Sequence, residues 1–179
     1  MEYDHRYPSD QTTFTHHDIP RPDLSKSQRE TVAHYDNATR WNDEVVDRIL
    51  MNFANEDAVV VYFSDHGEEV YDGSIKLYGR IHDEQPSAEV IRHEYEVPFM
   101  IWGSRKFRRL HPGLFERIQT AQHHPFSHDD LPHLLLGLAG IKTSHYKAHR
   151  DPLSPKFRPQ RRLLRGNINY DEVMRSSRP

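Results

Sequence analysis

A short apolar run that ends in a polar motif constrains the fold of this 179-residue chain more than any other feature. The run Ala58–Phe63 is β-branched and aromatic, and it is apolar on both of its alternating faces. This pattern is typical of a central strand that helices cover on both sides. Ser64-Asp65-His66-Gly67 follows at once, at the strand's carboxyl end, where open α/β sheets bind their ligands. We therefore expect an α/β domain whose chemistry lies at this strand end.

The segment before this strand has the pattern of an amphipathic helix. Ser27 and Glu30 fit a capping box at its start. The residues that form one face of the helix then recur at spacings near three and four: Val32, Tyr35, Thr39, Val46, Ile49, Leu50 and Phe53. The spacing predicts a helix that runs to about Phe53 and, with the strand, forms half of a doubly wound layer.

The remaining sequence predicts shorter elements. Residues 1–24 are expected to be irregular because Pro8, Pro20 and Pro22 interrupt them, and residues 70–95 are expected to form a long loop over the site. A strand is then predicted over 97–102, a short basic helix or turn over 104–110 and a helix over 112–120. Ser127 is expected to cap a last helix that Gly140 ends, and the apolar face of that helix consists of Leu131, Leu134, Leu135 and Leu138. Residues 1–155 are predicted to belong to one domain, and residues 156–179 to a basic, irregular tail.

Composition limits the classes of function. A formal net charge of -3 is too close to neutral to indicate nucleic-acid binding. The absence of cysteine excludes disulfide and thiolate chemistry. No apolar run approaches the ~20 residues that cross a bilayer, and the N-terminus lacks the basic and apolar regions of a signal peptide. This chain is thus expected to have neither a transmembrane segment nor a signal peptide, although a longer parent protein can still carry an upstream anchor.

Asp65 and His66 are the candidate metal ligands. A carboxylate oxygen beside an imidazole nitrogen suits zinc, which accepts both donors in a tetrahedral site. Gly67 is expected to let the backbone turn, because glycine accepts positive φ. The simpler alternative is that Asp65 caps the loop and His66 is solvated. Two ligands also leave a zinc site incomplete, so the others must come from elsewhere.

A resemblance to a known family supports the prediction of a metal site at Asp65 and His66. Residues 60–69, V-V-Y-F-S-D-H-G-E-E, resemble the zinc-binding segment of bacterial phosphoethanolamine transferases, which belong to the alkaline phosphatase/sulfatase superfamily. Further blocks occur in the same order in that family: R-Y-P at 6–8, Y-D-N at 35–37, V-P-F-M-I-W at 97–102 and L-L-L-G-L-A-G-I at 134–141. The resemblance covers roughly residues 3–155 and is greatest to enzymes that modify the heptose region of the lipopolysaccharide core. It implies that residues 1–155 are the C-terminal part of a sulfatase-like catalytic domain. The expected fold is a partial sandwich with a central, mostly parallel sheet flanked by helices.

The resemblance also implies a function. Such enzymes use zinc to transfer phosphoethanolamine from phosphatidylethanolamine to lipopolysaccharide, on the periplasmic face of the inner membrane, and an N-terminal part anchors them there. Asp65 and His66 match the family's metal pair. Glu68 or Glu69 is a candidate for orienting an imidazole, with solvated loop charge as the alternative.

The resemblance places three further functional groups outside this chain. The threonine nucleophile, a glutamate ligand and a substrate-binding histidine are expected upstream of residue 1, so no catalytic nucleophile is expected here and the chain alone is expected to be inactive. Relatives carry a substrate-binding histidine where this chain has Tyr78. The nearby His82 is the candidate substitute, with a surface histidine as the alternative.

Other functions remain open from the sequence. The chain can be part of a sulfatase or phosphodiesterase, which hydrolyses its substrate and binds calcium through more carboxylates, or it can be a metal-free remnant without catalysis. The basic tract at 156–162 suits contact with anionic lipid headgroups or lipopolysaccharide phosphates, or it is simply a solvated tail.

Overall fold

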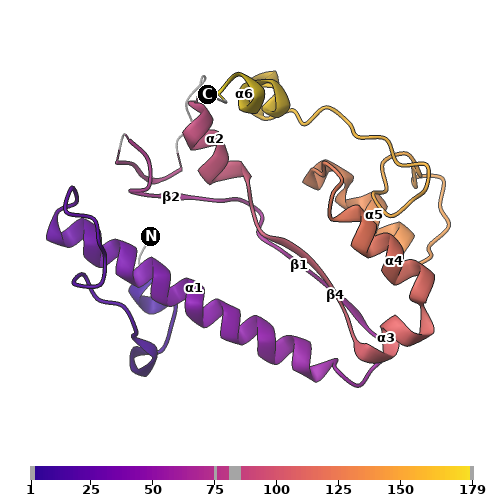
Figure 1. The fold of residues 1–179 in the computed structure, drawn as a ribbon, viewed down its shortest axis with the longest axis horizontal. Helices are drawn as coiled ribbons and strands as arrows, with labels where there is room; N and C mark the ends of the chain where they lie inside the picture. The colour runs from indigo at the N-terminus through magenta and orange to yellow at the C-terminus, as the bar shows by residue number, and fades with distance from the viewer. Residues whose placement is uncertain (1–2, 75, 81–85, 178–179) are drawn as a thin grey trace. The chain divides into compact units, whose positions relative to one another are not determined.

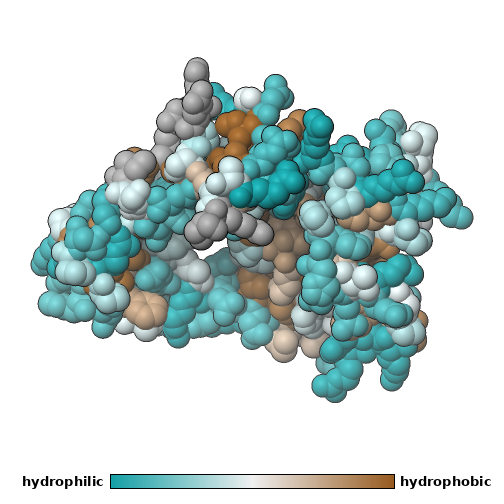
Figure 2. Space-filling model, turned by 45° about the horizontal axis from the view of Figure 1, so that its top comes forward, coloured by the Kyte–Doolittle hydropathy of each residue, from teal (hydrophilic) through white to brown (hydrophobic). Residues whose placement is uncertain are grey.

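The computed structural model describes residues 3–74, 76–80 and 86–177 and divides into two compact units (Figure 1). Unit 1 comprises Met1–Asn55 and Val60–Trp102. Unit 2 comprises Glu56–Val59 and Gly103–Pro179. Hydrophilic residues cover most of the face that Figure 2 shows, and apolar residues are visible in smaller separate patches. A mean hydropathy of -0.89 agrees with this surface.

The long helix α1, Lys26–Asn52, confirms the predicted helix. Its cap differs from the prediction, because Ser25 and not Ser27 is the N-cap residue. The Ser25 hydroxyl accepts a hydrogen bond from Gln28 N at 3.2 Å, and the Gln28 side chain accepts one from Ser25 N at 2.8 Å. Glutamine closes a capping box as well as glutamate does, so the same motif lies two residues earlier than expected.

Asn37 fixes the N-terminal segment against α1. This segment contains two 3-10 turns, η1 (Tyr3–His5) and η2 (Ser9–Gln11), and is otherwise irregular, as expected. Asn37 is 1% exposed. Its Oδ1 accepts hydrogen bonds from Thr13 N and Phe14 N, both at 2.8 Å, and its Nδ2 donates to Phe14 O at 2.8 Å and to the Tyr7 hydroxyl at 3.3 Å. The asparagine of the Y-D-N block therefore has a structural role.

We expect Asn37→Leu to lower the free energy of unfolding by about 3 kcal/mol, because it removes the buried side chain that accepts from two backbone N–H groups of the N-terminal segment and donates to Phe14 O and the Tyr7 hydroxyl. Asn42→Leu is the control. Asn42 is exposed on the same helix, and its side chain donates to the Tyr62 hydroxyl at the surface, so its loss should cost no more than about 0.5 kcal/mol. Urea unfolding followed by circular dichroism measures both values. Equal losses in the two variants would contradict this role of Asn37.

The two predicted strands exist and pair with each other. They are β1 (Val59–Phe63) and β4 (Phe99–Gly103), which form a two-stranded sheet. Ser64 N donates to Pro98 O at 3.2 Å at one end, and Ser104 N donates to Ala58 O at 2.9 Å at the other. These bonds make the pair antiparallel. The second sheet, β2 (Glu69–Val70) with β3 (Tyr78–Gly79), is also antiparallel. Both described pairs thus differ from the mostly parallel sheet that the sequence analysis expected.

The prediction of a loop throughout residues 70–95 was wrong. Helix α2 spans Ala88–Tyr95, and the Ser87 hydroxyl caps it by accepting a hydrogen bond from Val90 N at 3.3 Å. Val90, Ile91 and Glu94 are buried. Their spacing of three and four residues is a helical signal. This signal covers only a few residues and follows a polar stretch, so the sequence pattern did not predict the helix.

Unit 2 contains the predicted helices α3 (Arg105–Leu110) and α4 (Pro112–Ala121). Ser127 starts a 3-10 turn, η3 (His128–Asp130), which leads into α5 (Leu131–Leu138). As predicted, Gly140 ends this helix, with a φ of 66°. Ile141 N donates to Leu136 O at 2.9 Å, and Gly140 N to Gly137 O at 3.2 Å, which is a Schellman motif.

The C-terminal region is irregular only in part. It contains a 3-10 turn, η4 (Arg165–Asn167), and a helix, α6 (Tyr170–Ser176), which the Asn169 side chain caps. Residues 156–164 lie outside helices and strands, apart from an isolated bridge between Leu163 and Asn169. No helix among the described residues is both long enough and apolar enough to cross a bilayer.

Candidate functional site

Strand β1 delivers the sequence Ser64–Gly67 to a structured turn in unit 1. The Ser64 hydroxyl donates to His66 O at 2.7 Å, so the turn closes on itself. Ser64 N is held by Pro98 O, just before β4. The strand end and the turn are therefore fixed by hydrogen bonds on both sides of Asp65.

Asp65 and His66 direct their side chains toward a common point. His66 Nε2 lies 3.6 Å from Asp65 Oδ2. The Asp65 side chain is 85% exposed and that of His66 is 36% exposed. His66 Nδ1 lies 2.9 Å from Gly67 O. Because a carbonyl only accepts, Nδ1 is the donor in this contact, which leaves Nε2, on the side of Asp65, as the nitrogen that a metal can bind.

Gly67 is required for a different reason from the one expected. Its φ lies outside the left-handed region, in which the structure places only Gly79, Gly140 and Gly166 among the described glycines. A Cβ atom at residue 67 would lie 1.9 Å from His93 O. Gly67 N also donates to Glu94 O at 2.8 Å. The last turn of α2 thus lies directly against the backbone of the motif, and only glycine leaves room for it.

The two glutamates after Gly67 contact different partners. Glu68 Oε2 accepts a hydrogen bond from the hydroxyl of Tyr3, which is 4% exposed. Burial, followed by the hydrogen bond to Glu68, raises the pKa of Tyr3 well above its ordinary value. Glu68 therefore contacts Tyr3, while the carbonyl that orients His66 belongs to Gly67. A role for Glu68 in orienting a metal ligand stays a prediction.

Glu69 is the more deeply buried glutamate, at 1% exposed. Its Oε1 lies 2.9 Å from His93 Nδ1 on α2. Its Oε2 and the Oε1 of Glu68 are buried and find no hydrogen-bond partner among the described residues. Buried carboxylate oxygens without donors are rare and point to a polar or cationic neighbour. Sequence reasoning missed the contact with His93, since it assigned that residue to a loop.

The structure does not bring all the predicted site residues together. His82 lies outside the described residues. Within the part of the chain that the structure describes, no group of three or more His, Asp or Glu side chains is arranged to hold a metal ion. A second Asp–His pair occurs in unit 2, where His111 Nε2 lies 3.0 Å from Asp57 Oδ2. That pair does not lie in a motif like Ser64–Gly67, so it is a suitable control for the Asp65–His66 pair.

Comparison with known proteins identifies relatives of the whole chain. Residues 1–141 match the sulfatase family. Phosphoethanolamine transferase EptC of Escherichia coli (strain K12) and phosphoethanolamine transferase CptA of Salmonella typhimurium (strain LT2) are each 36% identical to this chain over 186 residues. Both alignments cover 97% of this chain and 30% of the relative. The chain thus spans less than a third of the length of these relatives.

Solved structures show the same relationship. The C-terminal periplasmic domain of EcEptC from Escherichia coli, crystallised in complex with Zn, matches with a TM-score of 0.77 and 31% identity. The match covers 99% of this chain and 50% of that domain. The corresponding domain of EptC from Campylobacter jejuni has a TM-score of 0.64 at 24% identity, which shows the fold alone. The predicted α/β class, with helices beside a small sheet, is confirmed.

Proposed function

Because this chain belongs to the sulfatase family, which matches residues 1–141, we propose that it forms part of a zinc-dependent phosphoethanolamine transferase. The donor is phosphatidylethanolamine and the acceptor is lipopolysaccharide. The relatives EptC and CptA are named phosphoethanolamine transferases, which supports this reaction. The matched domain of EcEptC is described as periplasmic, which supports a periplasmic location. We place the full-length protein at the inner membrane, anchored by an N-terminal part. The convergence of Asp65 and His66 is the observation that carries this proposal.

The geometry of this pair fits zinc. Two ligands at ordinary zinc bond lengths in a tetrahedral site stand about 3.3 Å apart. The separation of 3.6 Å between His66 Nε2 and Asp65 Oδ2 is close to that spacing. The Nε2 lone pair is available because Nδ1 donates to Gly67 O, an arrangement that zinc-binding histidines commonly use. Zinc bound here lowers the pKa of a coordinated hydroxyl and neutralises negative charge on a phosphoryl group.

The chain's own residues hold and shape the site. Ser64 and Gly67 fix the turn, so that the backbone of Asp65 and His66 is held in place before a metal binds. The exposed Asp65 leaves space for further ligands and for substrate. No threonine of this chain lies in the nucleophile context of the family, and we propose that the chain alone has no transferase activity. Release of diacylglycerol from phosphatidylethanolamine by the purified chain would contradict this.

We expect the purified chain to bind zinc weakly, and Asp65→Asn or His66→Gln to weaken that binding at least about tenfold, since each removes one of two ligands. Asp57→Asn is the matched control. It alters the Asp57–His111 pair and should leave the affinity unchanged. Zinc titration calorimetry measures all four proteins. With 14 histidines in the chain, this control separates the site from general binding to surface imidazoles.

The same titration separates the alternatives. Preference for calcium over zinc would favour a hydrolase of the sulfatase type. Equal zinc affinity in the wild type, Asp65→Asn and His66→Gln would remove the basis for the metal site and favour a non-catalytic remnant.

A further inference from the structure

The positive charge of this chain is concentrated in unit 2. Unit 2 contains 15 Lys and Arg residues against 8 Asp and Glu residues, whereas unit 1 contains 9 against 19. Their formal charges are therefore +7 and -10, which together give the net charge of -3. The basic segment, residues 156–165, holds five of these cations: Lys156, Arg158, Arg161, Arg162 and Arg165. No acidic residue occurs from Pro152 to Tyr170.

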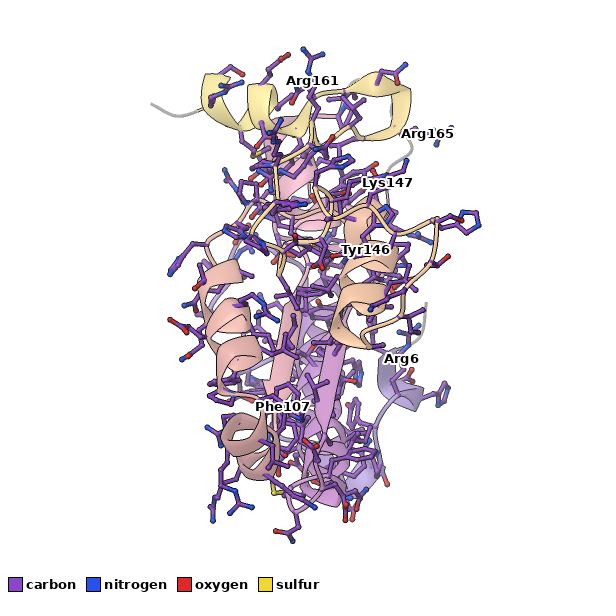
Figure 3. The ribbon with its side chains drawn as sticks, turned by 90° about the vertical axis from the view of Figure 1, so that its right-hand side faces the viewer. Arg6, Phe107, Tyr146, Lys147, Arg161 and Arg165 are labelled. Carbon is purple, nitrogen blue, oxygen red and sulfur yellow. The ribbon has the colours of Figure 1, made fainter. Side chains whose placement is uncertain are left out.

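Most cations of the basic segment have no ion-pair partner within the part of the chain that the structure describes. Arg162 pairs with Asp171 and lies over the Tyr170 ring, with its guanidinium carbon 4.3 Å from the ring centroid. The other four cations are exposed and form no ion pair with any described residue. Figure 3 shows Arg161 and Arg165 projecting outward from the ribbon of this segment. The unpaired charges are thus free to meet an anionic partner.

The basic segment is fixed in place and is not a free tail. At its start, the Phe157 ring stacks on His124 with centroids 5.0 Å apart, and Arg158 N donates to His149 O at 2.9 Å. At its end, Leu164 N donates to Ile168 O at 2.8 Å, and Tyr170 N donates to Arg162 O at 2.9 Å. The backbone therefore holds the cations in one region of unit 2, so that docking costs little additional ordering.

Apolar groups lie among these cations. Leu163, in the middle of the basic segment, is 47% exposed. An open hollow beside the start of the segment is lined by Ala148, His149, Pro155, Lys156, Phe157 and Arg158. Soluble polyanions such as heparin and duplex DNA present their charges on a polar surface, whereas a bilayer presents phosphates above acyl chains. Exposed leucine among basic residues therefore favours a bilayer.

We propose that the basic segment docks on the surface of a bilayer that contains anionic phospholipid. Each cation near such a surface contributes about fivefold to the affinity, and salt screens this attraction. The inference concerns a surface of unit 2 and does not depend on zinc or on the transferase reaction.

Co-sedimentation of the full chain with vesicles tests the proposal. We compare phosphatidylcholine vesicles with vesicles that also contain phosphatidylglycerol, over a series of salt concentrations. The test variant is R158Q/R161Q/R165Q. The control R105Q/K106Q/R109Q removes the same charge from exposed positions of α3 in the same unit. Thermal unfolding verifies that both variants fold.

We expect the wild type and the α3 control to bind the anionic vesicles, and the test variant to bind them at least about tenfold more weakly. Binding should decrease as salt increases. Absence of wild-type binding, or equal losses in both variants, would overturn the proposal. Heparin or duplex DNA that bound the basic segment as tightly as the vesicles do would also overturn it, because the partner would then be any polyanion.

Discussion

Replacement of Gly67 with alanine should destabilise this chain by about 3 kcal/mol or more. The added Cβ would lie 1.9 Å from His93 O, far inside van der Waals contact. Both atoms belong to fixed backbone segments, so no side-chain rotation relieves the overlap. Either the turn after Ser64 or the last turn of α2 must move, and the hydrogen bond from Gly67 N to Glu94 O is then lost.

Gly113→Ala is the control for this substitution. A Cβ atom at residue 113 would meet nothing within 4 Å, and the residue lies inside helix α4. Alanine there should be neutral or stabilising by up to about 1 kcal/mol, because it favours the helix. Urea unfolding of the two variants gives the comparison. If Gly67→Ala unfolded at the same urea concentration as the wild type, the close approach of α2 to the motif would be wrong.

The second large effect is expected for His93→Ala, which should lower the free energy of unfolding by about 3 kcal/mol. Glu69 is 1% exposed, and His93 is the described partner of its carboxylate. Its other oxygen already lacks a partner in the described part of the chain. Removal of the imidazole leaves a buried carboxylate with no described donor, and the cost of that desolvated charge dominates the effect.

A double-mutant cycle separates this pair from general loss of packing. Glu69→Gln removes the charge, so the double variant should be destabilised by less than the sum of the two single changes. His111→Ala breaks the exposed Asp57–His111 pair and should cost at most about 1 kcal/mol. Additive effects at Glu69 and His93, or a loss at His93 no larger than that at His111, would show that the buried pair contributes nothing specific.

The elements that sequence reasoning predicted well are those with strong local signals. The helix before the motif, both longer strands and the C-cap at Gly140 follow from periodicity and from residue types within one element. The turn that carries Asp65 and His66 was placed correctly for the same reason, since an apolar strand ends there, although β1 itself is only half-buried and not buried as its composition had suggested. The shift of the cap to Ser25 shows the limit of this approach, because two overlapping capping boxes fit the same sequence.

The features that could not be predicted depend on residues distant in sequence. The contact between Glu69 and His93 spans 24 positions and needs a helix whose short signal was missed. The antiparallel direction of β1 and β4 is set by the path of the chain between them, which strand composition does not encode. Glycine at 67 was identified as important, but its reason lies in the carbonyl of a residue 26 positions later.

The close approach of α2 to the motif has a consequence for how this chain can evolve. Every amino acid carries a main-chain carbonyl, so no exchange of the side chain at residue 93 can rescue a larger residue at 67. Residues 69 and 93 touch through side chains instead, and a loss at one can be suppressed by a matched change at the other. A mutation at residue 93 therefore cannot compensate for a larger residue at position 67. Residues 69 and 93, in contrast, can change together during evolution.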